Sequence, residues 1–300
     1  MEAIRGYDVA LGFIGPFLYF ERRQAQAAVE AGVHYVSIAD DYEAAREVLA
    51  LDEAARAAGV TIITGLGSGP GISNLLAKKG AQAMDRPRRI HIAWFSGVDQ
   101  ASGKANFRHS IHIFSGNVPS FENGREVMVR AGGGKEMVDF PPPCGRVPVY
   151  YVGHAEPVTL PRYIPGLETL TLKGGVWPAW QGRALILLER VGLFRSEKSQ
   201  KFWADLMCHV LPKLPSGKFT VSGFRVDVHG EKDGRPAHYW YTEVGSMVPA
   251  TGIPAALGAL MLAEGKISQR GVFPPEAVID PDPFFASLEP YGLRTESHEG

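Results

Sequence analysis

The chain has 300 residues, 45% of them hydrophobic, and a formal net charge of −1 at pH 7. This length suggests roughly two domains with a large core, and the near-neutral charge gives no reason to expect nucleic acid or an anionic membrane as a partner. The two cysteines, Cys144 and Cys208, make no disulfide framework, so we expect a cytoplasmic protein. No apolar stretch approaches the roughly 20 residues that span a bilayer.

The first part of the chain alternates between apolar runs and helical patterns. The runs cover residues 9–14, 33–38 and 60–63, and the helical patterns cover residues 22–31, 42–58 and 70–78. Short runs that are apolar on both faces and alternate with helices predict a buried parallel sheet. Three such strands are half of the six in a complete dinucleotide-binding fold. We therefore expect an incomplete Rossmann-type sheet, with the first half of that fold missing from this chain.

After Met84 the pattern changes to strands that follow one another directly. Strands are predicted at residues 90–95, 109–114, 126–129, 147–152 and 169–172, helices at 180–191 and 198–211, and a hairpin at 219–230 and 236–244. Directly successive strands indicate an antiparallel or mixed sheet. A very apolar helix at 252–264 and a proline-rich surface tail at 274–290 complete the chain. The predicted fold class is α/β, with a Rossmann-type part (1–80), an inserted α+β part (81–250) and a helix and tail that return to the first part (251–300).

Three loops follow the predicted parallel strands and mark a candidate ligand site. They are Gly15-Pro16-Phe17, residues 37–41 and residues 65–71. Ligands of such sheets bind at the carboxyl ends of the strands, and glycine allows the backbone to approach them closely. The third loop lacks the phosphate-binding fingerprint, because Pro70 occupies the position of its last glycine.

Several charged or titratable residues are weaker candidates. Lys173 and Gly174 end a predicted strand, where a lysine could bind a carboxylate or donate a proton, and Arg108 is a further carboxylate-binding candidate. His109 and His112 have a metal-like spacing, but on a strand this spacing puts the two side chains on opposite faces. The sequence therefore predicts no metal site.

Seven segments, in this order, resemble the saccharopine dehydrogenase-like family over nearly the whole chain. They are residues 15–17, 31–36, 51–61, 65–67 with 70–76, 251–256, 261–267 and 271–276. The resemblance implies a Rossmann domain, an inserted substrate domain with a mixed sheet, and a homodimer formed through that sheet. It also implies a reductase that uses NAD or NADP to make or cleave secondary amines joining amino acids or polyamines, by hydride transfer to and from an imine.

The resemblance also assigns expected roles to individual residues. The expected cofactor-binding residues are Gly15, Pro16, Phe17, Tyr35, Ser37, Gly67 and Pro70. The resemblance implies that Lys173, Gly174 and Thr251 bind an amino-acid-type substrate. Independently of the resemblance, Arg108 is expected to bind it as well, and Lys173 is the expected catalytic residue because a lysine at a strand end can donate a proton. The choice between NAD and NADP stays open, because the residue that reads the ribose lies in the part expected to be missing.

Two alternatives stay open beside the oxidoreductase. The chain could be a homologue without cofactor binding that acts as a dimerising scaffold or ligand-binding module. A metal-dependent hydrolase is a third hypothesis, which depends on the scattered histidines and would require stoichiometric zinc.

Overall fold

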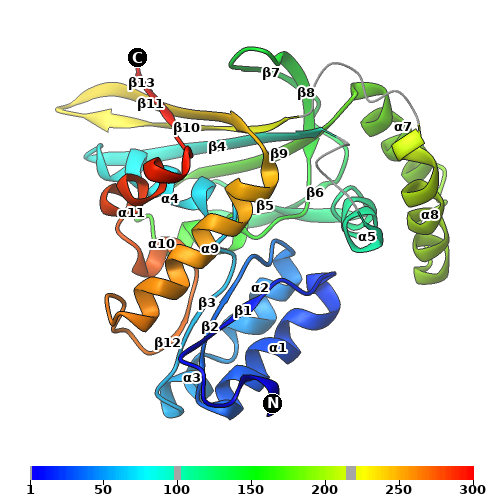
Figure 1. The fold of residues 1–300 in the computed structure, drawn as a ribbon. Coiled ribbons are helices and arrows are strands. Elements are labelled where there is room, and N and C mark those ends of the chain that lie inside the picture. Colours follow the sequence, from blue (N-terminus) through cyan, green and yellow to red (C-terminus); the bar gives the residue numbers. More distant parts are fainter. Residues whose placement is uncertain (1, 98–102, 214–220) are drawn as a thin grey trace.

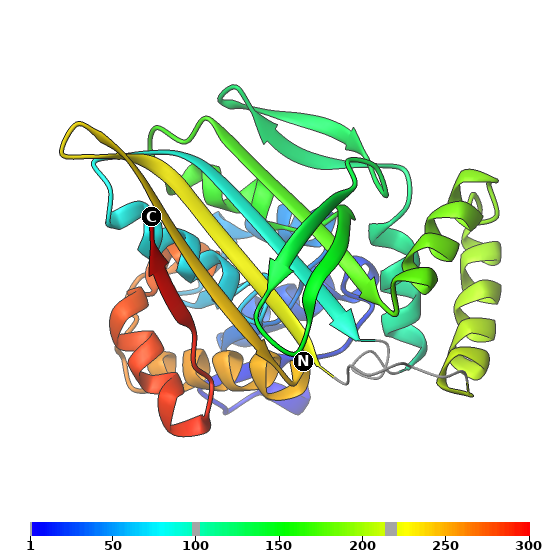
Figure 2. The same cartoon turned by 90° about the horizontal axis from the view of Figure 1, so that it is seen from above.

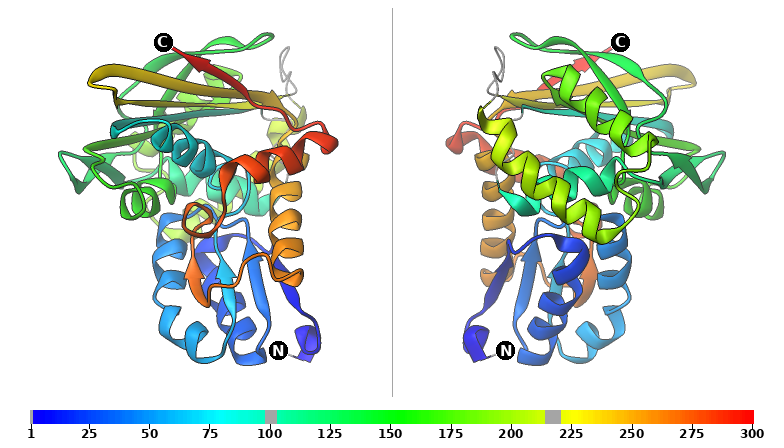
Figure 3. Two further views of the ribbon diagram at one scale, coloured as in Figure 1. Left: turned by 90° about the vertical axis from the view of Figure 1, so that its left-hand side faces the viewer. Right: turned by 90° about the vertical axis from the view of Figure 1, so that its right-hand side faces the viewer.

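The computed structural model describes residues 2–97, 103–213 and 221–300 (Figure 1). Within them, a four-stranded parallel sheet lies near the N-terminus and a nine-stranded mixed sheet extends across one end of it. Figure 3 shows the same two-part arrangement from both sides. The predicted α/β class, with a parallel sheet and a mixed sheet, is confirmed.

The parallel sheet contains the three predicted strands and one that the sequence did not predict. Its order is β1 (Val9–Gly12), β2 (His34–Ser37), β3 (Thr61–Ile63) and β12 (Gly271–Phe273). β12 comes from the C-terminal segment and pairs with β3 in parallel. The sequence did not reveal β12, because its place in the sheet depends on pairing with a strand about 200 residues earlier in the chain, which no local pattern records.

Helices cover both faces of this sheet because its side chains alternate between them. Tyr35 and Ile62 pack with Ala25 and Ala28 of α1 (Phe17–Ala31). The alternate positions, including Val36 and Ile63, belong to a second core that contains Ala255 of α9 (Met247–Ala263). α9 runs along β1 and β2, so the predicted return of the C-terminal helix is confirmed.

The mixed sheet has the order β13-β11-β10-β4-β9-β5-β6, and β8 connects β9 to β7. Its strands are β4 (Arg86–Gly97), β5 (Asn117–Glu122), β6 (Arg125–Arg130), β7 (Glu136–Phe140), β8 (Gly145–Tyr151), β9 (Thr169–Trp177), β10 (Ser222–Lys232), β11 (Arg235–Gly245) and β13 (Glu296–Glu299). β4 and β9 are parallel and the predicted hairpin β10–β11 is antiparallel. In Figure 2 this sheet is seen from its outer side, where no helix covers β4, β10 and β11.

The helices between the sheets and at their ends are short. They are α2 (Tyr42–Leu49), α3 (Asp52–Ala57), α4 (Ile72–Gln82), α5 (Lys104–Ile113), α6 (Glu156–Thr159), α7 (Ala179–Arg190), α8 (Glu197–Val210), α10 (Pro275–Val278) and α11 (Pro281–Leu288). α4 packs against β10 and β4 and is buried along most of its length. Within the described residues, no helix has both the length and the apolar character needed to cross a membrane.

Three predictions about local structure are wrong. Residues 109–114 belong largely to α5, because Phe107 and Ile111 are buried one helical turn apart rather than alternating. The single helix predicted at 42–58 is two helices, and the second begins at Asp52, whose carboxylate accepts a hydrogen bond from the Val272 N–H. The tail is not a surface segment, since Phe284 and Leu288 are almost fully buried in the large core.

Candidate functional site

A cleft of about 550 Å³ lies between the carboxyl ends of the parallel strands and the inner face of the mixed sheet. The wall at the strand ends includes Ile38 and Gly67, and the wall on the mixed sheet includes Ile92, Trp94 and Glu243. Residues of α5, α7, α8 and the beginning of α9 close its sides. The cleft is therefore where ligands of parallel α/β sheets bind.

Five of the predicted site residues line this cleft. They are Gly15, Pro16, Phe17, Gly67 and Thr251. Gly67 is packed so closely that a Cβ atom there would lie 3.3 Å from the Thr251 side chain. This close contact brings the beginning of α9 against the third strand-end loop.

The other predicted cofactor residues lie behind the cleft wall. The Tyr35 hydroxyl donates to Glu21 Oε2 over 3.0 Å, and the Ser37 hydroxyl donates to Glu21 Oε1 over 2.6 Å. All three side chains are buried. Pro70 shapes the third loop, since its carbonyl accepts the Gly67 N–H. Tyr35, Ser37 and Pro70 therefore support the wall rather than line the cleft.

Lys173, Gly174 and Arg108 are not among the residues that line the cleft. The Lys173 ammonium donates to Glu136 Oε2 over 2.6 Å and lies 5.0 Å from the centre of the Tyr151 ring. Gly174 lies beneath the indole of Trp94, which a Cβ atom at this position would overlap. The Arg108 guanidinium binds the Tyr19 hydroxyl and Glu197 instead.

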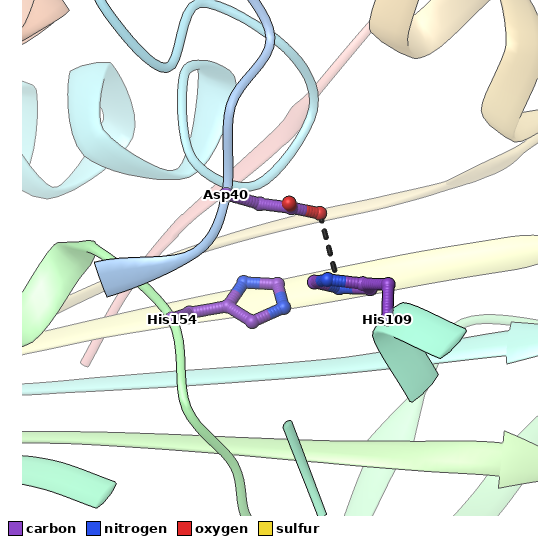
Figure 4. Close-up of side chains that lie close together, drawn as sticks. All are labelled: Asp40, His109 and His154. Carbon is purple, nitrogen blue, oxygen red and sulfur yellow. Dashed lines mark ion pairs between the residues drawn. The ribbon is translucent and has the colours of Figure 1, made fainter. Parts of the chain in front are cut away.

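At the end of β2, a cluster of charged residues that the sequence did not bring together surrounds His109. Its Nε2 lies 3.1 Å from Asp40 Oδ2, and its Nδ1 lies 3.0 Å from Asp41 Oδ1. Asp40 and Asp41 follow β2, and Asp41 also accepts the Leu18 N–H at the first turn of α1. Because α5 is a helix and not the predicted strand, it turns His109 toward both carboxylates, and Figure 4 shows the contact with Asp40.

Burial and charge act in opposite directions on these groups. Burial alone would lower the pKa of His109, but the charges of Asp40 and Asp41 outweigh it and raise this pKa to about 9. Burial likewise favours a raised pKa for Asp41, but the charge and hydrogen bond of His109 lower it to about 2. Burial raises the pKa of Asp40, against the opposing charge of His109.

His154 lies beside this cluster, on the loop between β8 and α6. Its ring stacks on the Trp94 indole with the ring centres 5.3 Å apart, and lies 5.6 Å from the ring of His109. Its Nδ1 is 3.7 Å from Glu156 Oε2. Figure 4 shows that His154, His109 and Asp40 converge from three separate elements.

A buried polar network holds Glu156 at the cleft. The Ser73 hydroxyl donates to Glu156 Oε1 over 3.0 Å. The neighbouring Asn74 donates to Thr159 and to Glu276 of the tail, and its own carbonyl accepts the Gly71 N–H. The segment 70–76 and the tail segment 271–276, both part of the family resemblance, thus meet behind the cleft.

Several buried polar atoms of the residues that line the cleft have no hydrogen-bond partner among the described residues. They are Asp40 Oδ1, Trp94 Nε1, both ring nitrogens of His154, Glu156 Oε2, both side-chain polar atoms of Gln181 and Glu243 Oε2. Burial raises the pKa of Glu243 to about 7. Buried polar groups are normally paired, so this concentration indicates a site that a polar ligand completes.

Comparison with known proteins assigns the chain to a family. The family model of the saccharopine dehydrogenase C-terminal domain matches residues 67–293. This chain belongs to the saccharopine dehydrogenase family.

The family relatives with similar sequences are named for polyamine chemistry. The chain is 34% identical over 175 residues to carboxyaminopropylagmatine dehydrogenase from Synechocystis, a match covering 51% of this chain and 43% of the relative. It is 26% identical over 265 residues to carboxynorspermidine synthase from Vibrio alginolyticus, covering 79% of this chain and 62% of that enzyme. The chain thus matches less than two thirds of the length of either relative.

Two solved structures share the family fold. Saccharopine dehydrogenase (L-Glu forming) from Saccharomyces cerevisiae has a TM-score of 0.66 at 15% identity, covering 98% of this chain and 85% of the yeast chain. The homospermidine synthase from Legionella pneumophila, solved in complex with NAD, has a TM-score of 0.61 at 13% identity, covering 97% of this chain and 75% of that one. At these identities the matches establish the fold.

The resemblance to the family is therefore confirmed. Many of the residues that line the cleft could not be predicted from the sequence. His154, Glu156 and Glu243 had no motif that set them apart. Asp40 lay within a strand-end loop that the sequence did single out. The spacing of His109 and His112 is visible in the sequence, but the predicted strand put the two side chains on opposite faces, whereas the segment is a helix.

Proposed function

We propose that this protein is an NAD(P)-dependent oxidoreductase that forms or cleaves a secondary amine of a polyamine-type substrate. The proposed reaction is hydride transfer to and from an imine. The observation that carries the substrate class is the charge of the cleft. Its described lining includes three carboxylates, those of Asp40, Glu156 and Glu243, against one cationic imidazole, His109, and no lysine or arginine. This favours a cationic amine over a dicarboxylate amino acid.

The strand-end wall fits the nicotinamide end of a dinucleotide. Gly15, Pro16 and Gly67 offer backbone without bulky side chains, and Ile38 offers an apolar surface. Trp94 adds a flat aromatic surface on the facing wall. When bound, the nicotinamide supplies or accepts the hydride. The protein orients the amine and keeps water away from the reacting carbon, while the choice between NAD and NADP stays open.

Glu243 is the residue that we propose binds an ammonium group of the substrate. It is 8% exposed, and its Oε2 has no partner among the described residues. Burying an unpaired carboxylate raises the free energy of the folded protein, and an ion pair with a substrate cation would offset this increase. Glu156, held by Ser73, is a second carboxylate at the same cleft.

The substrate class is tested by calorimetric titration of the NADPH-saturated and NADH-saturated protein with 1,3-diaminopropane and with glutamate. We expect the diamine to bind more tightly than glutamate. Glu243→Gln should weaken diamine binding by about 10- to 100-fold, the loss expected for a hydrogen bond to a charged group. Glu47→Gln, which changes an exposed carboxylate of α2, is the matched control. Tighter binding of glutamate would contradict the proposal.

We also propose that two copies associate through the outer face of the mixed sheet, as the family resemblance implies. Helices leave this face uncovered along β4, β10 and β11 (Figure 2). Its side chains include stacked rings of His238, Trp240 and His298. Light scattering should give the mass of a dimer, and a monomeric mass at micromolar concentration would contradict this arrangement.

A further inference from the structure

Asp40, His109 and His154 present one ligand atom each to a common point beside the cleft. These atoms all lie within 4.8 Å of one another, and His109 Nε2 and Asp40 Oδ2 are 3.1 Å apart. In a tetrahedral site with bonds of about 2.1 Å, ligand atoms lie roughly 3.4 Å apart. Small side-chain movements would therefore bring all three atoms to metal-ligand distance.

His154 is the strongest sign that a ligand is meant to bind here. Its side chain is 6% exposed, yet within the described part of the chain neither ring nitrogen has a hydrogen-bond partner, and Asp40 Oδ1 is also without one. A buried imidazole without partners loses the hydrogen bonds that it would make in water. Figure 4 shows the His154 ring directed toward His109 and Asp40.

Each histidine also has a second carboxylate near its Nδ1, within hydrogen-bond distance at His109 and beyond it at His154. Asp41 Oδ1 lies 3.0 Å from His109 Nδ1, and Glu156 Oε2 lies 3.7 Å from His154 Nδ1. Histidines that bind metals usually donate their second ring N–H to a carboxylate or carbonyl, which fixes the ring and makes it a stronger ligand. The described residues thus supply three ligands and the outer carboxylates that would support two of them.

A second group of histidines and an aspartate gives a useful contrast. Asp227, His229 and His238 lie equally close together on β10 and β11. There the Arg225 guanidinium donates to both oxygens of Asp227, and His238 Nε2 also binds Asp227 Oδ1. An ion at that place would have to displace an arginine, whereas no arginine or lysine lines the cleft in the described chain.

We propose that Asp40, His109 and His154 bind a divalent transition-metal ion of the zinc class, with a free coordination position facing the cleft. Two imidazoles and one carboxylate suit such ions, and sites that act on ligands keep one position open. The site itself does not depend on the proposed reaction.

The test is calorimetric titration of the EDTA-treated, dialysed protein with ZnCl₂, together with the visible absorption of the Co²⁺ form. We expect one ion per chain and an absorption spectrum typical of low-symmetry, nitrogen-ligated Co²⁺. His154→Ala and Asp40→Asn should each weaken binding by about 100-fold or more. Asp41→Asn, which removes an outer carboxylate, should weaken it by about 10- to 100-fold.

Two controls make the test specific. His112→Ala changes the next turn of α5, where His112 pairs with Glu43, and should leave metal affinity unchanged. His238→Ala should also leave it unchanged. Circular dichroism of each metal-free variant confirms that it is folded. Absence of Zn²⁺ binding, or loss of binding in His238→Ala but not in His154→Ala, would overturn the proposal. NAD(P)H or amine binding is measured separately, so failure here leaves the proposed reaction untouched.

Discussion

At the scale of single residues, the family resemblance and the structure make different predictions for Lys173. A role in binding a substrate carboxylate predicts that Lys173→Ala weakens the substrate by roughly 1.5–3 kcal/mol. Its ion pair with Glu136 and its absence from the cleft lining predict an unchanged Michaelis constant. Steady-state kinetics of the variant decides between them, and a raised Michaelis constant would return Lys173 to the site.

Glu21 makes a second prediction at this scale, about pH. Burial raises its pKa from 4.5 to about 7, against hydrogen bonds from Ser37 and Tyr35. The folded protein therefore holds this proton more firmly than the unfolded chain. The resulting stability is fully present below pH 4.5 and is lost as pH rises through 7, by up to roughly 3 kcal/mol.

Urea unfolding of the wild type and of Glu21→Gln between pH 5 and 8 measures this effect. We expect the free energy of unfolding to fall less steeply with pH in the variant. Glu30→Gln, an exposed position on the same helix, is the control and should keep the wild-type slope. Equal slopes for all three proteins would show that Glu21 is ionised without cost in the folded state.

At the scale of elements, the contact between α9 and the parallel sheet depends on Gly258. A Cβ atom there would overlap Cδ2 of Leu66, which is fully buried. Gly258→Ala should therefore destabilise the protein by about 1–3 kcal/mol. Gly252, on the same helix, has no atom within 4 Å of such a Cβ, so Gly252→Ala should be neutral or stabilising by up to about 1 kcal/mol. Urea unfolding that gives equal stabilities for the two variants would contradict this packing.

Elements also show what the sequence could and could not predict. The parallel strands and the hairpin β10–β11 were correct, because apolar runs and an Asp233-Gly234 turn are local signals. α5 was predicted as a strand, since His-Ser-Ile-His-Ile alternates over a length too short to distinguish the two periods. β12 depends on pairing with β3, about 200 residues away in the chain, and no local pattern records such a pairing.

At the scale of the whole molecule, the cleft forms where distant segments meet. Gly15 and Gly67 come from the parallel sheet, His154 and Glu243 from the mixed sheet and its loops, and Thr251 from α9. The strand ends were predictable because parallel strands share one edge. The residues on the facing mixed sheet were not predictable, because the position of that sheet relative to the strand ends depends on long-range packing, which no local sequence pattern records. The division at residues 80 and 250 and the cytoplasmic location stay predictions.

The proposed oxidoreductase activity is tested by NAD(P)H consumption with aliphatic diamines and a 2-oxo acid or aldehyde as coupling partners. It is run on the 300-residue chain and beside it on the chain extended by any residues that its gene encodes in frame upstream. We expect amine-dependent oxidation of NADH or NADPH by at least one form, with loss of activity in Glu243→Gln. If neither form binds nor oxidises either cofactor, the oxidoreductase proposal is wrong and a ligand-binding scaffold becomes the better interpretation.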